Sequence, residues 1–94
     1  MPSVVSQPLA LASLTPESIR SVVITFLARY VDDPDELERE RLLTGGILDS
    51  LAAVGLIAYL ERKFDVTVVD EDLEIDNFDS LGAIVDFIGR KLCL

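Results

Sequence analysis

The sequence contains no histidine and no tryptophan, and its single cysteine is Cys93. Without histidine, the commonest acid–base residue of enzymes is missing, and no Ser-His-Asp or Cys-His arrangement can form. One cysteine gives neither a disulfide within the sequence nor a cysteine-rich zinc site, so we expect Cys93 to be a reduced thiol. The sequence also has no Gly-rich phosphate loop and no cluster of metal-ligating residues. We therefore expect no catalytic residues and no metal site.

Basic residues are scarce as well. Eight Lys and Arg residues against 17 Asp and Glu residues give a formal net charge of -9. A surface with this balance repels nucleic-acid phosphates and anionic membranes, so neither is expected as a partner. No run of about 18 apolar residues is present that could cross a bilayer. The first 14 residues lack a basic start and contain Pro2 and Pro8, which argues against a secretory signal and favours a cytoplasmic location.

What the sequence does have is enough aliphatic residues for one small core. Half of the residues are hydrophobic but only 6% are aromatic, so Leu, Ile and Val must form most of it. A chain of 94 residues leaves little room for a second core. We interpret residues 1–14 as a flexible N-terminal extension and residues 15–94 as one domain.

Apolar residues at helical spacing predict three main helices. The first begins at the capping sequence Thr15-Pro16-Glu17 and spans residues 15–31. The second begins at Asp49 or Ser50 and ends near Phe64, and the third begins at Asp79-Ser80. The residues expected to face the core are Ile19, Val22, Val23, Phe26, Leu27 and Tyr30 in the first helix, Ala53, Leu56, Ile57, Leu60 and Phe64 in the second, and Leu81, Ile84, Val85, Ile88 and Leu92 in the third.

Two connections separate these helices. Residues 32–48 are rich in acids, are interrupted by Pro34 and close with Gly45-Gly46, which predicts a long loop with a helical turn around residues 37–43. Residues 65–69 have the composition of a strand. Because no second strand-like run exists to pair with them, we interpret them as an extended connector.

The acidic run that follows predicts a short helical turn at residues 70–73. This run is not a calcium-binding loop, because its sixth position is Ile75 rather than glycine and its twelfth is Leu81 rather than glutamate. These elements predict an all-α fold, a small bundle of three to four helices with a long loop between the first two.

The second predicted helix has no charged residue from Leu51 to Leu60. A bundle of this size cannot bury every side of a helix, so we expect the face with Leu51, Val54, Gly55 and Ala58 to be exposed for a partner. The alternative is that this helix is simply the most central one in the bundle.

The order of these features resembles the acyl carrier proteins and the related peptidyl or aminoacyl carriers. The resemblance covers about residues 15–92 and is carried by Leu48-Asp49-Ser50-Leu51, an apolar helix ending in Glu61-Arg62-Lys63-Phe64, an acidic turn and an amphipathic last helix. Asp-Ser-Leu alone is common by chance, but its place after a long loop and before this helix makes the match specific. The resemblance implies that residues 15–94 form a carrier domain of a discrete, stand-alone carrier.

The resemblance further implies that Ser50 is the attachment point of 4'-phosphopantetheine, with Asp49 and Leu51 as the flanking motif. A phosphopantetheinyl transferase takes the group from coenzyme A. The arm then holds an acyl or aminoacyl group as a thioester, loaded by an adenylating ligase or acyltransferase and passed to downstream synthase or tailoring enzymes. The protein would be a monomeric, non-catalytic carrier that other enzymes use as a substrate.

The tripeptide of the motif occurs a second time, as Asp79-Ser80-Leu81. Either serine could cap its helix, which contributes about 1 kcal/mol. We favour Ser50 as the modified residue because it follows Gly45-Gly46 and begins the helix with the uncharged face. We interpret Asp79-Ser80 as a structural cap.

Carriers of fatty acid synthesis typically place acids on the early turns of the second helix, where this sequence has Ala52, Ala53 and Gly55. We therefore expect docking with few salt bridges. The expected docking residues are Leu51, Val54, Gly55, Ala58, Tyr59 and Arg62. This departure favours a role in polyketide or non-ribosomal peptide biosynthesis. The alternatives are a carrier of general fatty acid synthesis and a helical protein–protein adaptor without a prosthetic group.

Overall fold

The computed structural model describes residues 15–93, so the expected N-terminal extension lies outside the described residues. This part of the chain has four α-helices and three short 3-10 helices, and no strand occurs between residues 15 and 93. The all-α prediction is therefore confirmed. The α-helices are α1 (Pro16–Leu27), α2 (Ser50–Phe64), α3 (Ile75–Phe78) and α4 (Leu81–Lys91), and the 3-10 helices span Ala28–Tyr30, Pro34–Glu38 and Asp70–Asp72.

Each of the three long helices begins at a side chain that accepts a hydrogen bond from its first turn. Thr15 Oγ1 accepts from the Ser18 N–H at 3.1 Å, and Ser18 Oγ accepts from the Thr15 N–H at 2.8 Å, a reciprocal capping box. Ser80 Oγ accepts from the Ala83 N–H at 3.1 Å and starts α4 as predicted. Such caps contribute about 1 kcal/mol each and fix where each helix begins.

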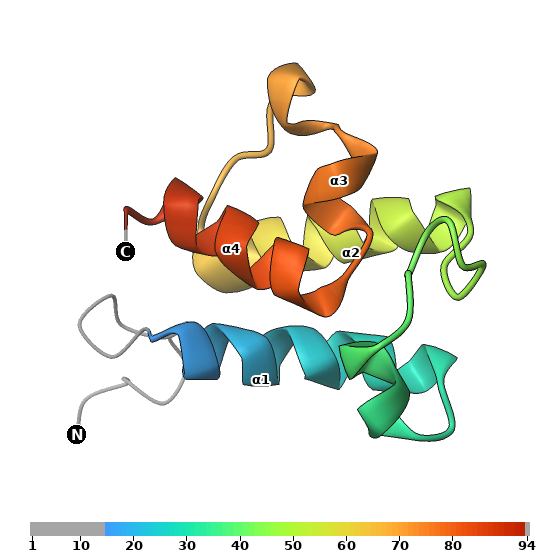
Figure 1. Ribbon diagram of the computed structural model, residues 1–94. Coiled ribbons are helices and arrows are strands. Elements are labelled where there is room, and N and C mark those ends of the chain that lie inside the picture. Colours follow the sequence, from blue (N-terminus) through green and yellow to red (C-terminus); the bar gives the residue numbers. More distant parts are fainter. Residues whose placement is uncertain (1–14, 94) are drawn as a thin grey trace.

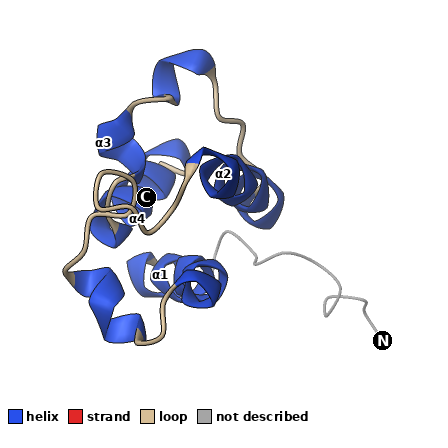
Figure 2. Cartoon of the chain, turned by 90° about the vertical axis from the view of Figure 1, so that its right-hand side faces the viewer, coloured by secondary structure: helices blue, strands red, loops and turns tan. Residues whose placement is uncertain are grey.

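The three long helices enclose one core. In Figures 1 and 2, α1 lies beneath both α2 and α4, while α3 lies on the side of α4 that is remote from α1. The loop between α1 and α2 also contributes, because three of its leucines are buried. The buried apolar residues are Ile19, Val23, Phe26, Leu27, Leu37, Leu42, Leu48, Leu56, Leu60, Phe64, Phe78, Leu81, Ile84, Phe87 and Ile88.

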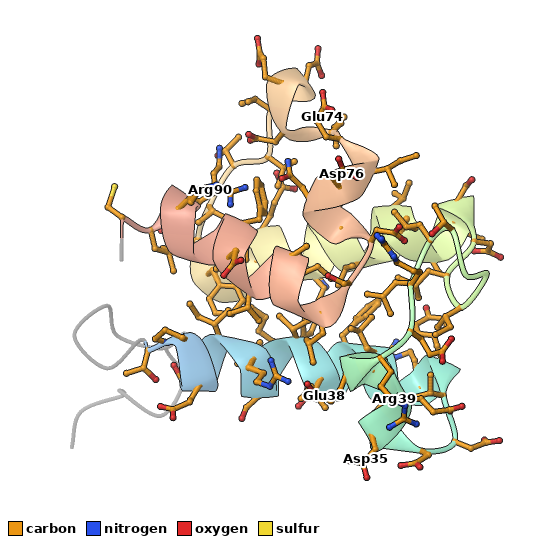
Figure 3. All side chains as sticks on the ribbon, viewed as in Figure 1. Asp35, Glu38, Arg39, Glu74, Asp76 and Arg90 are labelled. Carbon is orange, nitrogen blue, oxygen red and sulfur yellow. The ribbon has the colours of Figure 1, made fainter. Side chains whose placement is uncertain are left out.

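Two short elements differ from the prediction. The helical turn of the long loop spans Pro34–Glu38 rather than residues 37–43, because Asp33 caps it by accepting the Asp35 N–H at 3.0 Å and proline occupies its first position. Glu38, labelled in Figure 3, also forms an ion pair with Arg20 of α1, which ties this turn to the bundle. The predicted turn at residues 70–73 is a 3-10 helix, and the short fourth α-helix lies after it, as α3.

The packing of α4 also differs in detail. Phe87, which was not among the expected core residues, is buried, and its ring lies 5.1 Å from that of Phe78 in an edge-to-face arrangement. Val85 and Leu92 are only half-buried, and Tyr30 of the first helical segment is exposed. Phe87 is buried because α3 packs on α4 and places Phe78 against its ring.

Candidate functional site

A hydrogen bond within its own backbone holds the two ends of the loop before α2 together. Leu42 and Leu48 are both buried, and the Leu48 N–H donates to the Leu42 carbonyl at 2.7 Å. Gly46 has a φ of 86°, a conformation that side-chain-bearing residues rarely adopt. A Cβ on Gly45 would lie 2.2 Å from the Arg41 carbonyl oxygen, so no side chain fits there. The chain therefore reaches the start of α2 along one defined path.

Ser50 is the first residue of α2 and is exposed, but it does not cap the helix. The cap is Asp49, whose Oδ1 accepts the Ala52 N–H at 2.8 Å. Within residues 15–93 the Ser50 hydroxyl forms no hydrogen bond. Ser80, in contrast, uses its hydroxyl as a cap. The two serines of the repeated tripeptide thus differ, since the Ser80 hydroxyl caps a helix and the Ser50 hydroxyl has no hydrogen-bond partner among the described residues.

The backbone around Ser50 suits an anionic group. The Ala53 N–H already donates to the Asp49 carbonyl at 2.9 Å, whereas the N–H groups of Ser50 and Leu51 have no acceptor among the described residues. These groups lie at the positive end of the helix dipole, where phosphate is favourably placed. The part of the chain that the structure describes contains no group of three or more His, Cys, Asp or Glu side chains that could hold a metal ion.

Two neighbouring, mainly apolar hollows lie along α2 between Ser50 and α3, and together they are called the groove. Its open part, about 510 Å³, lies beside Leu48, Asp49 and Ser50, and its narrower part, about 160 Å³, lies between α2 and α3. Leu43, Ala53 and Ile75 line both parts. Ala53 and Ile57, expected in the core, are only half-buried because they face this groove. The remaining lining residues of the narrow part are Leu56, Leu73, Glu74 and Phe78.

One wall of this groove comes from α3 and the residues before it, which sequence reasoning did not assign to the site. Leu73 and Ile75 are more than half exposed, so they stand at the rim rather than in the core. Glu74, which lines the groove, and Asp76, both labelled in Figure 3, belong to the same segment and make it acidic. Ile75 and Phe78 are three residues apart, but a helix of 4 residues is too short to show a period, so no sequence pattern revealed this wall.

The expected docking residues of α2 fall into two sets. Leu51 and Val54 are 80% and 63% exposed, Arg62 is exposed and Ala58 is half-buried. Leu51 and Val54 therefore form an apolar surface near Ser50, and Arg62 adds a positive charge in the last turn of α2.

Gly55 and Tyr59 instead face α1. A Cβ on Gly55 would lie 3.7 Å from the Phe26 ring. The Tyr59 ring lies 4.9 Å from that of Phe26, and its hydroxyl donates to the Val22 carbonyl at 2.8 Å. Burial raises the pKa of the Tyr59 hydroxyl, although the positive charge of Arg29 acts in the opposite direction. The expectation of one exposed surface thus holds for only part of the set.

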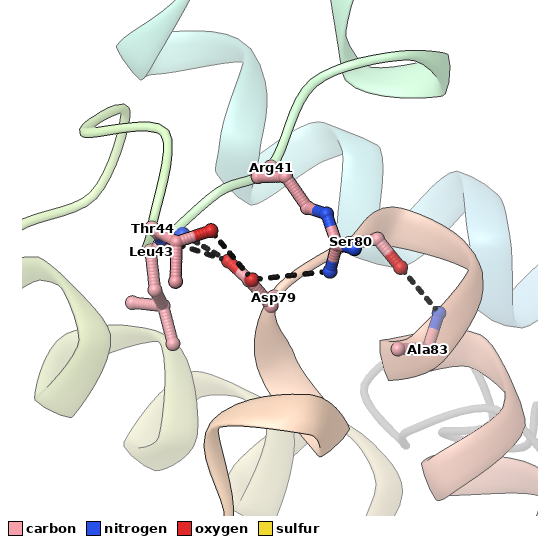
Figure 4. Close-up of polar contacts among 6 residues, drawn as sticks. All are labelled: Arg41, Leu43, Thr44, Asp79, Ser80 and Ala83. Carbon is pink, nitrogen blue, oxygen red and sulfur yellow. Dashed lines mark hydrogen bonds and ion pairs between the residues drawn. The ribbon is translucent and has the colours of Figure 1, made fainter.

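Asp79 is a buried carboxylate beside the loop that leads to Ser50, and the sequence did not reveal its contacts. Its side chain is 3% exposed and lies at the junction of α3 and α4. As Figure 4 shows, Oδ1 accepts the N–H groups of Leu43 and Thr44 at 2.8 and 2.9 Å, and Oδ2 accepts the Thr44 hydroxyl at 2.8 Å. The Arg41 guanidinium lies 3.3 Å from Oδ2.

Two opposing effects act on the Asp79 carboxyl. Burial raises its pKa, whereas the hydrogen bonds from Thr44 and Leu43 and the charge of Arg41 lower it, and the net effect is a pKa below the ordinary value. The carboxylate is therefore charged near neutral pH. Sequence analysis assigned Asp79 only to a cap, although Ser80 alone performs that role.

Comparison with known proteins identifies the family of the chain. A family model described as "Phosphopantetheine attachment site" matches residues 17–88. The chain therefore belongs to this family of carrier proteins, the class that includes acyl and peptidyl carriers. Proteins of the family carry covalently attached 4'-phosphopantetheine, are modified by a phosphopantetheinyl transferase, and are non-catalytic substrates of the ligases or transferases that load and unload them.

Among individual proteins, the chain is similar to several D-alanyl carrier proteins. The one from Streptococcus mutans serotype c is 31% identical over 71 residues, which cover 74% of this chain and 90% of that protein. The one from Streptococcus pyogenes serotype M5 is 35% identical over 69 residues, which cover 72% and 87%. No solved structure gives a significant match. Between residues 15 and 93, no helix combines the length and the apolar character needed to cross a membrane.

Proposed function

We propose that Ser50 is the residue that carries the 4'-phosphopantetheine arm, and that the arm's cargo is an aminoacyl group. The single observation that supports the choice of serine is the free hydroxyl of Ser50 beside a helix start that Asp49 already caps. The only other serine in the same tripeptide, Ser80, has its hydroxyl engaged with Ala83.

The residues around Ser50 fit the group. The Asp49 cap holds the first turn of α2, so the N–H groups of Ser50 and Leu51 stay directed toward a phosphodiester on the serine. When bound, phosphopantetheine supplies a terminal thiol that holds cargo as a thioester. No described side chain near Ser50 is arranged as a general base, so Asp49 orients the motif and takes no proton.

We further propose that partner enzymes dock on Leu51, Val54, Ala58 and Arg62. Leu51 and Val54 are the exposed large apolar side chains of α2, and exposure of this kind is typical of an interaction surface. Because the surface contains one charge, association should depend less on salt than docking on an acid-rich helix does. Gly55 and Tyr59 are left out because they face α1.

The likeness to proteins named D-alanyl carriers supports an amino acid as cargo, which an adenylating ligase would load. The absence of acids from the first turn of α2 supports partners other than those of general fatty acid synthesis. We therefore retain polyketide or non-ribosomal peptide biosynthesis as the proposed pathway class, with a synthase or tailoring enzyme receiving the aminoacyl group.

The attachment site can be tested by intact-mass measurement after incubation with coenzyme A and a broad-specificity phosphopantetheinyl transferase. The wild type and Ser80→Ala should each gain one phosphopantetheine mass, and Ser50→Ala should gain none. Ser80→Ala is the matched control, since it removes a serine from the same tripeptide. A gain that survives in Ser50→Ala would refute the assignment of the arm to this residue.

The cargo can be tested on the holo form of the wild type. We expect an amino-acid adenylating ligase with ATP and D-alanine to add one alanyl mass that neutral hydroxylamine removes, as it does from thioesters. An acyltransferase with a panel of acyl-coenzyme A donors serves as the comparison. Efficient acyl transfer without aminoacyl loading by any adenylating ligase tried would overturn the aminoacyl proposal and leave the arm's position untouched.

A further inference from the structure

The junction between α3 and α4 holds the loop that leads to Ser50. Three consecutive N–H groups of that loop bond to one residue. The Leu42 N–H donates to the Asp79 carbonyl oxygen at 2.8 Å, and those of Leu43 and Thr44 donate to its carboxylate. The Thr44 hydroxyl and the Arg41 guanidinium complete the contacts (Figure 4). Residues 41–44 are thus fixed to a point more than 30 positions away in the sequence.

This fixed segment is coupled to the start of α2. The Leu42 carbonyl accepts the Leu48 N–H, and Asp49 and Ser50 follow directly. Leu43 lines the same groove as Ser50. A displacement of residues 42–44 would therefore move Leu48 and change where the Ser50 hydroxyl lies relative to the groove.

A stabilising role alone does not account for a charged group at this position. Removing a carboxylate from water is costly, and such buried charges contribute little net stability compared with well-packed apolar residues. Capping does not require it either, because Ser80 caps α4. What the carboxylate provides is a defined geometry, since its two oxygens fix two N–H groups and one hydroxyl of a glycine-containing loop at once.

We infer that Asp79 is a positioning residue for the transfer of phosphopantetheine to Ser50, because it holds residues 42–44 and so presents the serine to the transferase in one orientation. This inference rests on the proposed role of Ser50. In the transfer, a bond forms between Ser50 Oγ and the phosphorus next to pantetheine in coenzyme A. The bond from that phosphorus to adenosine 3',5'-bisphosphate breaks, and the hydroxyl proton passes to a base of the transferase.

The test compares Asp79→Ala with Ser80→Ala in steady-state transfer from coenzyme A, well below the melting temperature of every variant. Both changes remove side-chain hydrogen bonds at the same junction, but only the first one frees the loop. Asp79→Ala should lower kcat/KM for the carrier about tenfold or more, mainly through KM, because several hydrogen bonds that fix the loop are lost. Ser80→Ala should change kcat/KM for the carrier less than about twofold, since only the start of α4 is affected.

If Asp79→Ala does not fold, two further measurements test the positioning role of Asp79. Thr44→Val should lower kcat/KM severalfold while Thr44→Ser restores it, because serine keeps the hydroxyl that reaches Oδ2. In the wild type, the amide hydrogens of Leu43 and Thr44 should exchange more slowly than that of Gly45, and Asp79→Asn should speed their exchange. A kcat/KM for Asp79→Ala within twofold of that of Ser80→Ala, or equal values for the two Thr44 variants, would overturn the inference.

Failure of the positioning role of Asp79 can be distinguished from failure of the proposed role of Ser50. If Ser50→Ala still gains phosphopantetheine, the assignment of Ser50 fails and the positioning role fails with it. If Ser50→Ala gains none and the Asp79 and Thr44 variants are modified as well as their controls, only the positioning role is wrong.

Discussion

Gly45 offers the sharpest test of how closely the loop before α2 is packed. A Cβ at this position would lie 2.2 Å from the Arg41 carbonyl oxygen and 3.1 Å from its carbonyl carbon. Both atoms belong to the backbone, so the neighbour cannot move aside by changing a rotamer. Residues 41–45 must shift as a unit, and Asp79 holds part of that unit.

The cost of Gly45→Ala can be set against a control in the same protein. Overpacking of this kind typically costs about 1–3 kcal/mol. Gly82 lies in the first turn of α4, where an added Cβ meets nothing within 4 Å, and alanine is a better helix former than glycine, by at most about 0.5–1 kcal/mol. The two variants carry the same chemical change, yet one should be less stable than the wild type and the other more stable.

Thermal and urea unfolding, followed by circular dichroism, would measure the stabilities of Gly45→Ala and Gly82→Ala. For a domain of this size, each kcal/mol moves the melting temperature by about 4–8 °C. Gly45→Ala should therefore melt at least about 4 °C below the wild type, and Gly82→Ala should melt a few degrees above it. If Gly45→Ala were within about 0.5 kcal/mol of the wild type, the loop would be looser than described and the reasoning about its fixed path would be refuted.

Three further outcomes are expected. Val54→Glu should lower kcat/KM for loading of the holo form about tenfold or more without changing helicity, because a charge enters the apolar docking surface; unchanged loading kinetics would exclude this face as the contact. Tyr59→Phe should cost about 1 kcal/mol in urea unfolding through the lost bond to Val22 and leave loading unaltered, since it faces α1; a loading defect without a stability loss would contradict that placement. The pKa of Asp79 is lower when folded than the ordinary unfolded value, so the stability it provides is present above about pH 4 and is lost as the pH falls through the folded pKa. Unfolding free energies measured from pH 7 down to pH 2 should show this loss in the wild type and a smaller one in Asp79→Asn, and parallel curves would argue against it.

The helices that could be predicted from the sequence are those with a local signal. Thr15-Pro16 and Ser80 start α1 and α4 as expected, and α2 ends at Phe64, because caps and apolar spacing act over a few residues. The choice between Asp49 and Ser50 as the cap of α2 stayed open, since both are capping residue types and stand side by side. Only the bond to Ala52 distinguishes them.

The features that could not be predicted depend on tertiary contacts. A helix of four residues such as α3 is too short to show a period, and its place follows from the packing of Phe78 on Phe87. Asp79 binds groups 35 to 38 positions away, which no local pattern reveals. Tyr59 lies on the uncharged stretch of α2 and was expected at its surface, but the preceding helix supplies both a ring and a carbonyl that draw it inward.

Asp49 caps α2 and Ser50 does not, which has a consequence for the folding free energy once Ser50 is modified. Because the fold makes no use of the Ser50 hydroxyl, converting it to a phosphodiester breaks no hydrogen bond within the described part of the chain. Attaching the arm therefore removes no contact from the fold, and any change in folding free energy comes from new contacts of the arm, such as its phosphate beside the N–H groups at the start of α2. The modified form should be at least as stable as the unmodified one, so a partner enzyme that distinguishes the forms should recognise the arm and its cargo.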